Sequence, residues 1–188
     1  MNTGTVSVRY AKALLEYSVG KGVEDRVYAE MQILYDRLRS VPKVTELINN
    51  PTIGRADKAR LLRTVVSDTP ENMTQVTCDF INLVVNSSRE EYLLFMAQSY
   101  IQQYKKSKGI TTVHLTSVVP LDDSRKSRIR AIVDRVVTES TLEWVEKIDP
   151  SIIGGFILQI DGYRLDASTA AQIRKIRKEL IDKNNRII

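Results

Sequence analysis

The sequence predicts a mainly helical α+β protein, with a six-helix bundle over residues 1–106 and a small α/β domain over residues 107–188. Three observations lead to this fold class. Apolar residues recur at helical spacing from residue 5 to about residue 106. The run Lys105-Lys106-Ser107-Lys108-Gly109 then interrupts that spacing with charge and a glycine. Beyond it, apolar and polar residues alternate as they do in β-strands, so we place a domain boundary here.

The first three predicted helices are defined by apolar stripes and by the residues that end them. The stripes are Val6, Tyr10, Ala13, Leu14 and Tyr17 in the first helix, Val27, Met31, Leu34 and Leu38 in the second, and Leu47 and Ile48 in the third. Gly20 and Gly22 end the first helix, because glycine readily adopts the left-handed conformation common after a helix. The third begins at Val41-Pro42 and stops at Asn49-Asn50-Pro51, since the residue before proline avoids the helical region.

The next three helices are predicted mainly from their starts. The fourth covers Ala56 to Val66. Thr69-Pro70-Glu71 has the features of a helix start, with an N-cap residue, a proline at the first position and an acid in the first turn. Asn86-Ser87-Ser88 closes this fifth helix, and Ser88 with Glu91 has the spacing of a capping box for the sixth. Short loops between amphipathic helices favour a compact antiparallel bundle.

The second half is predicted to combine strands with helices. Strands are expected over residues 110–118, 142–148, 152–160 and 163–165, with one helix from Pro120 to about Thr138 and another from Ala167 or Ser168 onward. A turn at Asp149-Pro150 leads into the third strand. Gly154 and Gly155 lie inside that strand, where a glycine pair indicates a bulge, a sharp bend, or a backbone or partner chain too close for a Cβ.

Composition indicates a soluble globular protein. Charged residues make up 27% and hydrophobic residues 43% of the chain, which is ordinary usage for a globular domain. No apolar run approaches the roughly 20 residues that a membrane-spanning helix needs. The first residues lack the basic and apolar segments of a secretory signal, so we expect a cytoplasmic protein.

The sequence offers no recognisable catalytic or metal-binding constellation. Cys78 is the only cysteine, which excludes an internal disulfide and a multi-cysteine metal site. It lies in an apolar helical pattern and is interpreted as a small buried hydrophobic residue. The single histidine, His114, has no acid or thiol near it in sequence. The glycines fit neither the dinucleotide nor the phosphate-loop spacing. We therefore expect no enzyme activity, no cofactor and no metal.

The net charge of +5 is spread along the chain. The one dense basic segment is the last predicted helix, with Arg174, Lys175, Arg177, Lys178, Lys183 and Arg186. Cations near a helix C-terminus also follow from the helix dipole, so a solvated face is favoured. A basic nucleic-acid-binding protein remains the alternative, and it requires salt-dependent binding through this helix.

Binding through a helical groove is the mechanism that a bundle of this kind can offer. Two helices can leave an apolar groove that accepts a partner's amphipathic helix. The first helix presents Tyr10, Ala13, Leu14 and Tyr17. The fifth has more apolar residues than one core stripe needs, namely Val76, Phe80, Ile81, Leu83, Val84 and Val85. Periodicity alone favours a purely structural role for these residues over a groove.

A series of short motifs carries a resemblance to a known family. They are Arg9-Tyr10-Ala11-Lys12-Ala13-Leu14, Asn50-Pro51-Thr52-Ile53 with Lys58 and Leu61-Leu62, Asn86 with Arg89, Ser117, Pro120-Leu121, Ile148-Asp149-Pro150-Ser151-Ile152-Ile153-Gly154-Gly155-Phe156, and Asp166 with Ser168. In this order and spacing, the chain resembles over nearly its whole length the δ subunit of bacterial F-type ATP synthases, whose mitochondrial counterpart is the oligomycin-sensitivity-conferring protein.

The resemblance implies a non-catalytic stator subunit of the proton-translocating ATP synthase. Residues 1–106 are then expected to bind the N-terminal helices of α subunits on the catalytic head, and residues 107–188 the peripheral stalk of b subunits. The implied α-subunit contacts are Tyr10, Ala13, Leu14 and Tyr17, with Phe80, Leu83 and Val84 by position; the implied structural positions are Asp149, Pro150, Gly154, Gly155, Asp166 and Ser168. The protein is expected on the cytoplasmic side of the bacterial cell (inner) membrane, held there only through the complex and resisting rotational torque. The resemblance implies neither a nucleic-acid partner nor a small-molecule substrate.

Overall fold

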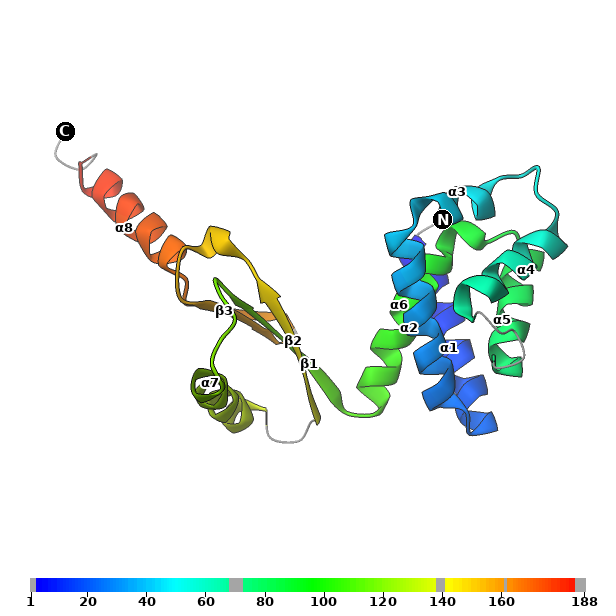
Figure 1. The fold of residues 1–188 in the computed structure, drawn as a ribbon, viewed down its shortest axis with the longest axis horizontal. Helices are drawn as coiled ribbons and strands as arrows, with labels where there is room; N and C mark the ends of the chain where they lie inside the picture. The colour runs from blue at the N-terminus through cyan, green and yellow to red at the C-terminus, as the bar shows by residue number, and fades with distance from the viewer. Residues whose placement is uncertain (1–2, 68–72, 138–140, 161, 185–188) are drawn as a thin grey trace. The chain divides into compact units, whose positions relative to one another are not determined.

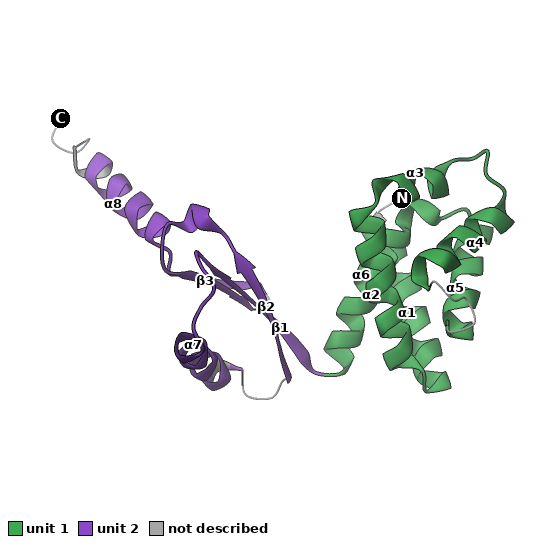
Figure 2. Cartoon of the chain, viewed as in Figure 1, with its two compact units in different colours: residues 1–108 green, residues 109–188 purple. Residues whose placement is uncertain are grey.

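The computed structural model describes residues 3–67, 73–137, 141–160 and 162–184 (Figure 1). The chain divides into two compact units, residues 1–108 and residues 109–188 (Figure 2). As the fold class predicted, the protein is mainly helical with a small sheet in its C-terminal part. The division falls after Lys108, next to the glycine where the apolar period changes.

Helices make up the regular structure of the first unit. They are α1 (Thr3–Lys21), α2 (Glu24–Ser40), α3 (Pro42–Asn49), α4 (Arg55–Val66), α5 (Gln75–Asn86) and α6 (Leu93–Ser107), with a short 3-10 helix, η2 (Glu90–Tyr92), before α6. Gly22 follows α1 with a φ of +66°, the left-handed conformation expected there. The predicted start of the fifth helix at Thr69-Pro70-Glu71 lies outside the described residues, and α5 itself begins at Gln75.

Helix α6 packs against both α1 and α2 and so fixes α1 in place. Its Tyr100 is fully buried, and the phenol oxygen lies 3.0 Å from Ser18 Oγ on α1 while donating to the Glu24 carbonyl on α2. Burial raises the pKa of Tyr100 to about 12, so its hydroxyl stays protonated. One buried side chain therefore links three helices through satisfied polar contacts.

The start of α6 differs from the predicted capping box. Ser88 has a φ of +52°, and neither η2 nor α6 has a side-chain cap. Glu90, the residue before Glu91, forms an ion pair with Lys58 on α4, with 3.1 Å between Nζ and Oε1. Both side chains are almost fully buried. This ion pair ties η2 to α4, 32 residues away in sequence, a contact that periodicity along one segment does not reveal.

A buried carboxylate on α2 holds the N-terminus of α5. Glu30 accepts hydrogen bonds from the Thr74 backbone N–H at 2.7 Å, from the Thr74 hydroxyl at 2.6 Å and from the Thr77 hydroxyl. Thr74 is also the N-cap, since its Oγ1 accepts from the Thr77 backbone N–H. This network sets where α5 begins relative to α2.

We expect Glu30→Gln to lower the free energy of unfolding of the first unit by about 2–3 kcal/mol, because the amide keeps the shape but removes the charge that strengthens three hydrogen bonds. Urea unfolding followed by helical circular dichroism measures the change. Glu46→Gln, at an exposed position on α3, is the matched control and should change it by less than about 0.5 kcal/mol. Equal stability of the two variants would show that the network contributes nothing.

The second unit contains a mixed four-stranded sheet in the order β2-β1-β3-β4. Its elements are β1 (Ile110–Ser117), α7 (Asp123–Val136), β2 (Thr141–Ile148), the 3-10 helix η3 (Pro150–Ile152), β3 (Phe156–Ile160), β4 (Tyr163–Asp166) and α8 (Thr169–Asn184). Strands β1 and β2 are parallel and joined through α7, while β3 is antiparallel to both β1 and β4. The core comprises Val113, Leu115 and Leu158 of the sheet with Ile129 and Val133 of α7.

The glycine pair lies in a turn before β3 and not inside a strand, which corrects the predicted strand over residues 152–160. The chain forms η3 over Pro150–Ile152 and enters β3 only at Phe156. Gly155 has a φ of +75°, and a Cβ there would lie 2.2 Å from the Ala167 carbonyl oxygen. A Cβ on Gly154 would lie 2.6 Å from Thr169 Oγ1. Of the three explanations left open by the sequence, a sharp bend applies at both glycines and close approach of another backbone applies at Gly155.

The segment that approaches the glycines is the junction between β4 and α8. Asp166 accepts hydrogen bonds from the backbone N–H and the hydroxyl of Ser168. Ser168 Oγ in turn accepts from the Ala171 backbone N–H at 3.1 Å and caps α8. Asp149 likewise accepts from the Ser151 backbone N–H at 3.0 Å. Hydrogen bonds from the hydroxyl and the backbone N–H of Ser151 lower the pKa of Asp149, and those of Ser168 lower the pKa of Asp166. The two motifs are parts of one folded junction.

Candidate helix-binding groove

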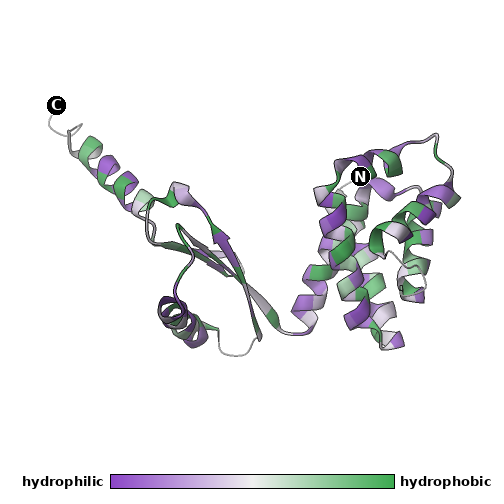
Figure 3. Ribbon diagram, viewed as in Figure 1, coloured by the Kyte–Doolittle hydropathy of each residue, from purple (hydrophilic) through white to green (hydrophobic). Residues whose placement is uncertain are grey.

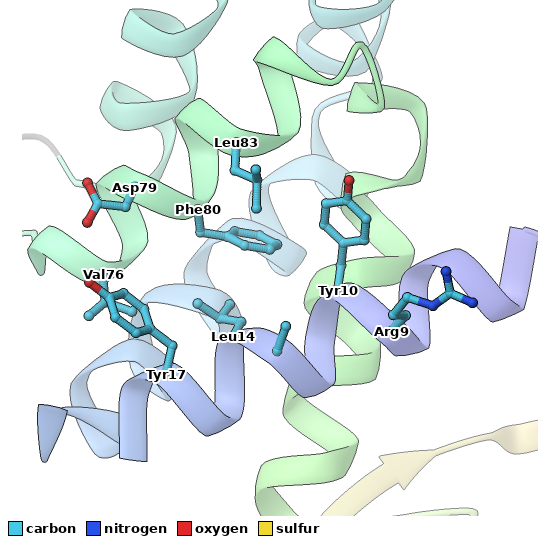
Figure 4. A pocket seen from close by; sticks show the side chains of 9 residues that line it. Arg9, Tyr10, Leu14, Tyr17, Val76, Asp79, Phe80 and Leu83 are labelled. Carbon is cyan, nitrogen blue, oxygen red and sulfur yellow. The ribbon is translucent and has the colours of Figure 1, made fainter. Parts of the chain in front are cut away.

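A groove of about 540 Å³ runs between α1 and α5 (Figure 4). It is lined by Arg9, Tyr10, Ala13, Leu14 and Tyr17 of α1 and by Val76, Asp79, Phe80 and Leu83 of α5. Tyr10 and Leu83 lie at one end and Tyr17 and Val76 at the other, so the two helices run in opposite directions along it (Figure 4). Most of the lining is apolar, as in sites that accept an amphipathic helix.

The floor and the rim of the groove come from different predicted residues. Leu14 and Phe80 form the floor and are only 4% and 5% exposed. Ala13 is exposed on the rim, and its small side chain leaves room for a helix to approach. Tyr17 and Leu83, 46% and 53% exposed, also stand on the rim. Large apolar side chains exposed around an apolar floor mark an interaction surface.

Val84 does not belong to the groove. Its side chain is fully buried in the core of the first unit and is absent from the lining, which corrects its predicted role as a contact residue. The apolar residues of α5 therefore lie on two faces of the helix. Phe80 and Leu83 line the groove, while Ile81, Val84 and Val85 pack inside the unit. Two charged residues, Arg9 and Asp79, also line the groove, and neither belongs to the apolar stripes that indicated it.

Tyr10 is held at its end of the groove by Arg89. The Arg89 guanidinium donates a hydrogen bond to the Tyr10 hydroxyl oxygen at 2.8 Å and lies 5.3 Å from the ring centroid. Arg89 directly follows Ser88, whose positive φ turns the chain after α5. The Tyr10 hydroxyl thus accepts one bond and keeps its own proton available to a partner.

The two residues considered for chemistry, Cys78 and His114, are not part of the groove lining. Among the residues that the structure describes, no group of three or more histidine, cysteine or acidic side chains could hold a metal ion. Cys78 on α5 is half-buried and not the fully buried residue that its pattern indicated. Burial raises the pKa of its thiol, which disfavours the reactive thiolate. His114 is exposed on β1. None of the described helices is both long and apolar enough to span a bilayer.

A second candidate surface is the apolar stripe of α8, defined as Ile173, Ile176, Leu180 and Ile181. These side chains are between 49% and 63% exposed, and the hydropathy colouring shows apolar and polar residues alternating around the helix (Figure 3). Arg174, Lys175, Arg177 and Lys178 are exposed on the same helix. Arg186 lies outside the described residues. A helix of this length is only marginally stable in water without a packing partner. A partner that covers this stripe would therefore stabilise α8.

Comparison with known proteins finds similarity to one protein family along nearly the whole chain. A family model described as "ATP synthase delta (OSCP) subunit" matches residues 6–180. The ATP synthase subunit delta of Bacteroides thetaiotaomicron is 40% identical over 188 residues, and that of Phocaeicola vulgatus is also 40% identical over 188 residues, each alignment covering both chains completely. The subunit delta of Lactobacillus acidophilus is 29% identical over 179 residues, or 95% of this chain and 96% of the relative.

A solved structure shares the fold. A chain in the cryo-EM structure of the Toxoplasma gondii mitochondrial ATP synthase hexamer aligns with a TM-score of 0.72 over 93% of this chain and 97% of that chain. The sequence identity is 17%, so this likeness concerns the fold alone.

Proposed function

Because the chain belongs to the family of ATP synthase delta (OSCP) subunits, which are non-catalytic stator components of the F-type ATP synthase, we propose that its two units join the catalytic head to the peripheral stalk. The first unit binds the N-terminal helix of an α subunit, and the second binds the b subunits. A subunit of this kind is a peripheral component of the membrane complex, and we place it on the cytoplasmic side of the bacterial inner membrane. The nucleic-acid-binding alternative has no support among the relatives.

The α1/α5 groove is the observation that carries the head-binding assignment. Its floor of Leu14 and Phe80 can accept the apolar face of a helix, and Ala13 permits close approach. Each large apolar side chain that a partner buries there contributes roughly 1.5–3 kcal/mol before the entropic costs of association. Several such anchors are enough for a stable, non-covalent link.

The α8 stripe supports the stalk-binding assignment. The helix is exposed from Gln172 to Ile181, so packing within its own unit covers its N-terminal residues, such as Ala170, and leaves the stripe uncovered. The long helices of a stalk can cover such a stripe, because apolar residues at helical spacing form a narrow seam suited to helix packing. Torque then passes from the head through two folded units to the stalk.

We expect the double variant Ile176→Asp, Leu180→Asp to weaken binding of the soluble part of the b subunit at least tenfold, since each substitution places a charge in the buried seam. Isothermal titration calorimetry measures the affinity. Gln172→Asp, which adds one negative charge at an exposed polar position of the same helix, should leave the affinity within about twofold. Unchanged stalk binding in the double variant, with α8 intact, would remove α8 from the interface.

A further inference from the structure

Ile153, between η3 and β3, adopts a backbone conformation that β-branched residues rarely occupy. Its φ is +66° and its ψ is −39°. The backbone N–H of Gly154 donates to the Ile152 carbonyl at 2.8 Å, so Ile153 is the central residue of a γ-turn with positive φ, the rarer and more strained form of that turn. Among the described residues, Ser88 is the only other non-glycine residue with a positive φ. A β-branched residue at such a φ needs a physical explanation.

Packing within the chain does not explain an isoleucine at this position. The Ile153 side chain is 63% exposed, whereas its neighbour Ile152 is 5% exposed. The turn itself needs no side chain here, because glycine adopts a positive φ without steric cost and already occupies the two following positions, Gly154 and Gly155. A large apolar side chain that is held exposed by a strained turn indicates a contact outside the chain.

The γ-turn lies against the start of α8, on the side of that helix that bears the α8 stripe. The Thr169 backbone N–H donates to the Gly154 carbonyl at 2.9 Å, and a Cβ on Gly154 would lie 2.6 Å from Thr169 Oγ1. Thr169 precedes Ile173 by four residues and Ile176 by seven, so helical periodicity places all three on one face. Ile153 directly precedes Gly154 and therefore lies at the N-terminal end of the stripe.

We propose that Ile153 is an anchor of the stalk-binding surface and continues the α8 stripe beyond the start of the helix. The occupant is the b-subunit helix that covers the stripe, and its apolar seam also covers Ile153. From Thr169 to Leu180 the stripe rises about 16 Å, or about three helical turns, and Ile153 extends this contact. The strained turn holds the side chain in place before the partner arrives, which lowers the ordering cost of binding. This inference rests on the proposed stalk-binding function and adds a residue outside α8.

Ile153→Gly in the full chain separates a binding role from a packing role, because the two roles predict opposite changes in stability. The substitution should weaken binding of the soluble part of the b subunit about five- to tenfold, measured by titration calorimetry. It should also raise the urea midpoint of the second unit by about 0.5 M, since glycine relieves the strain of the turn. The fluorescence of Trp144, the only tryptophan, follows that unfolding. Ile153→Asn keeps a side chain but makes it polar, and it should weaken binding to the same extent.

Ile132→Gly is the matched control. Ile132 is 54% exposed on α7, where glycine should lower the urea midpoint and leave the affinity within about twofold of wild type. Ile153→Leu keeps an apolar side chain and should stay within about threefold.

Wild-type affinity in Ile153→Gly overturns the inference. A urea midpoint that fails to rise also overturns it, because the turn is then not strained. If the Ile176→Asp, Leu180→Asp variant weakens stalk binding and Ile153→Gly does not, the failure is confined to Ile153 and the stalk-binding function stands. Absence of b-subunit binding by the wild-type chain overturns that function, and the role of Ile153 falls with it.

Discussion

Ala13→Trp is expected to weaken binding of the α-subunit N-terminal helix by about 100-fold, equivalent to about 3 kcal/mol. Ala13 lies on the exposed rim of the α1/α5 groove, beside the buried floor formed by Leu14 and Phe80. An indole at this position fills the space that a docked helix needs, so the partner loses its close approach along the whole groove. Titration calorimetry with the α-subunit peptide and the full chain measures the affinity.

Lys12→Trp is the matched control for this substitution. Lys12 lies on the same helix with its side chain 70% exposed and outside the groove lining. The same indole there should leave peptide affinity within about threefold of wild type. Helical circular dichroism establishes that both variants keep the fold of the first unit. Wild-type affinity in a folded Ala13→Trp protein would place the α-subunit contact on another surface.

Gly155→Val is expected to destabilise the second unit by about 3–5 kcal/mol. The added Cβ would meet the Ala167 carbonyl oxygen at 2.2 Å, and φ at Gly155 is +75°, a conformation that β-branched residues strongly avoid. The β4–α8 junction has to move away, and with it the cap of α8 at Ser168. Stalk binding should be lost, while peptide binding by the first unit persists.

Trp144 is the one tryptophan of the chain and lies on β2, so its fluorescence during urea unfolding reports on the second unit. Gly162→Ala is the control, because Gly162 also has a positive φ, +91°, but no atom lies within 4 Å of an added Cβ. Its cost should be about 1–2 kcal/mol, the conformational strain alone. Equal destabilisation by the two variants would mean that the approach of Ala167 adds no cost beyond backbone strain.

Local patterns predicted the elements whose ends depend on local contacts. Asp122 caps α7 by accepting from the Arg125 backbone N–H at 2.7 Å, at the helix start that Pro120 to Asp123 indicated. Gly22 follows α1 with the expected positive φ. Ser168 caps α8 within the predicted range. In the two caps, the side chain and the backbone N–H group that it accepts from are three residues apart.

Contacts between distant segments explain what the sequence did not reveal. No side chain caps η2 or α6, and Glu90 pairs with Lys58 on α4, 32 residues away. The glycine pair accommodates Ala167, twelve residues beyond Gly155, which a strand pattern does not indicate. Val84 and Leu83 are neighbours in the apolar run of α5, yet one is buried and the other exposed on the groove. Assigning the two faces requires the position of α1.

The proposed function requires that one chain use two separate surfaces for two partners. The most direct test is co-purification of the full chain with both the catalytic head and the soluble part of the b subunit, analysed by size-exclusion chromatography. Wild type should form one assembly that contains both partners. Ala13→Trp should lose only the head, and Ile176→Asp with Leu180→Asp should lose only the stalk. Retention of the head by a folded Ala13→Trp protein, or loss of both partners from either variant, would show that the two partners do not bind through these two surfaces.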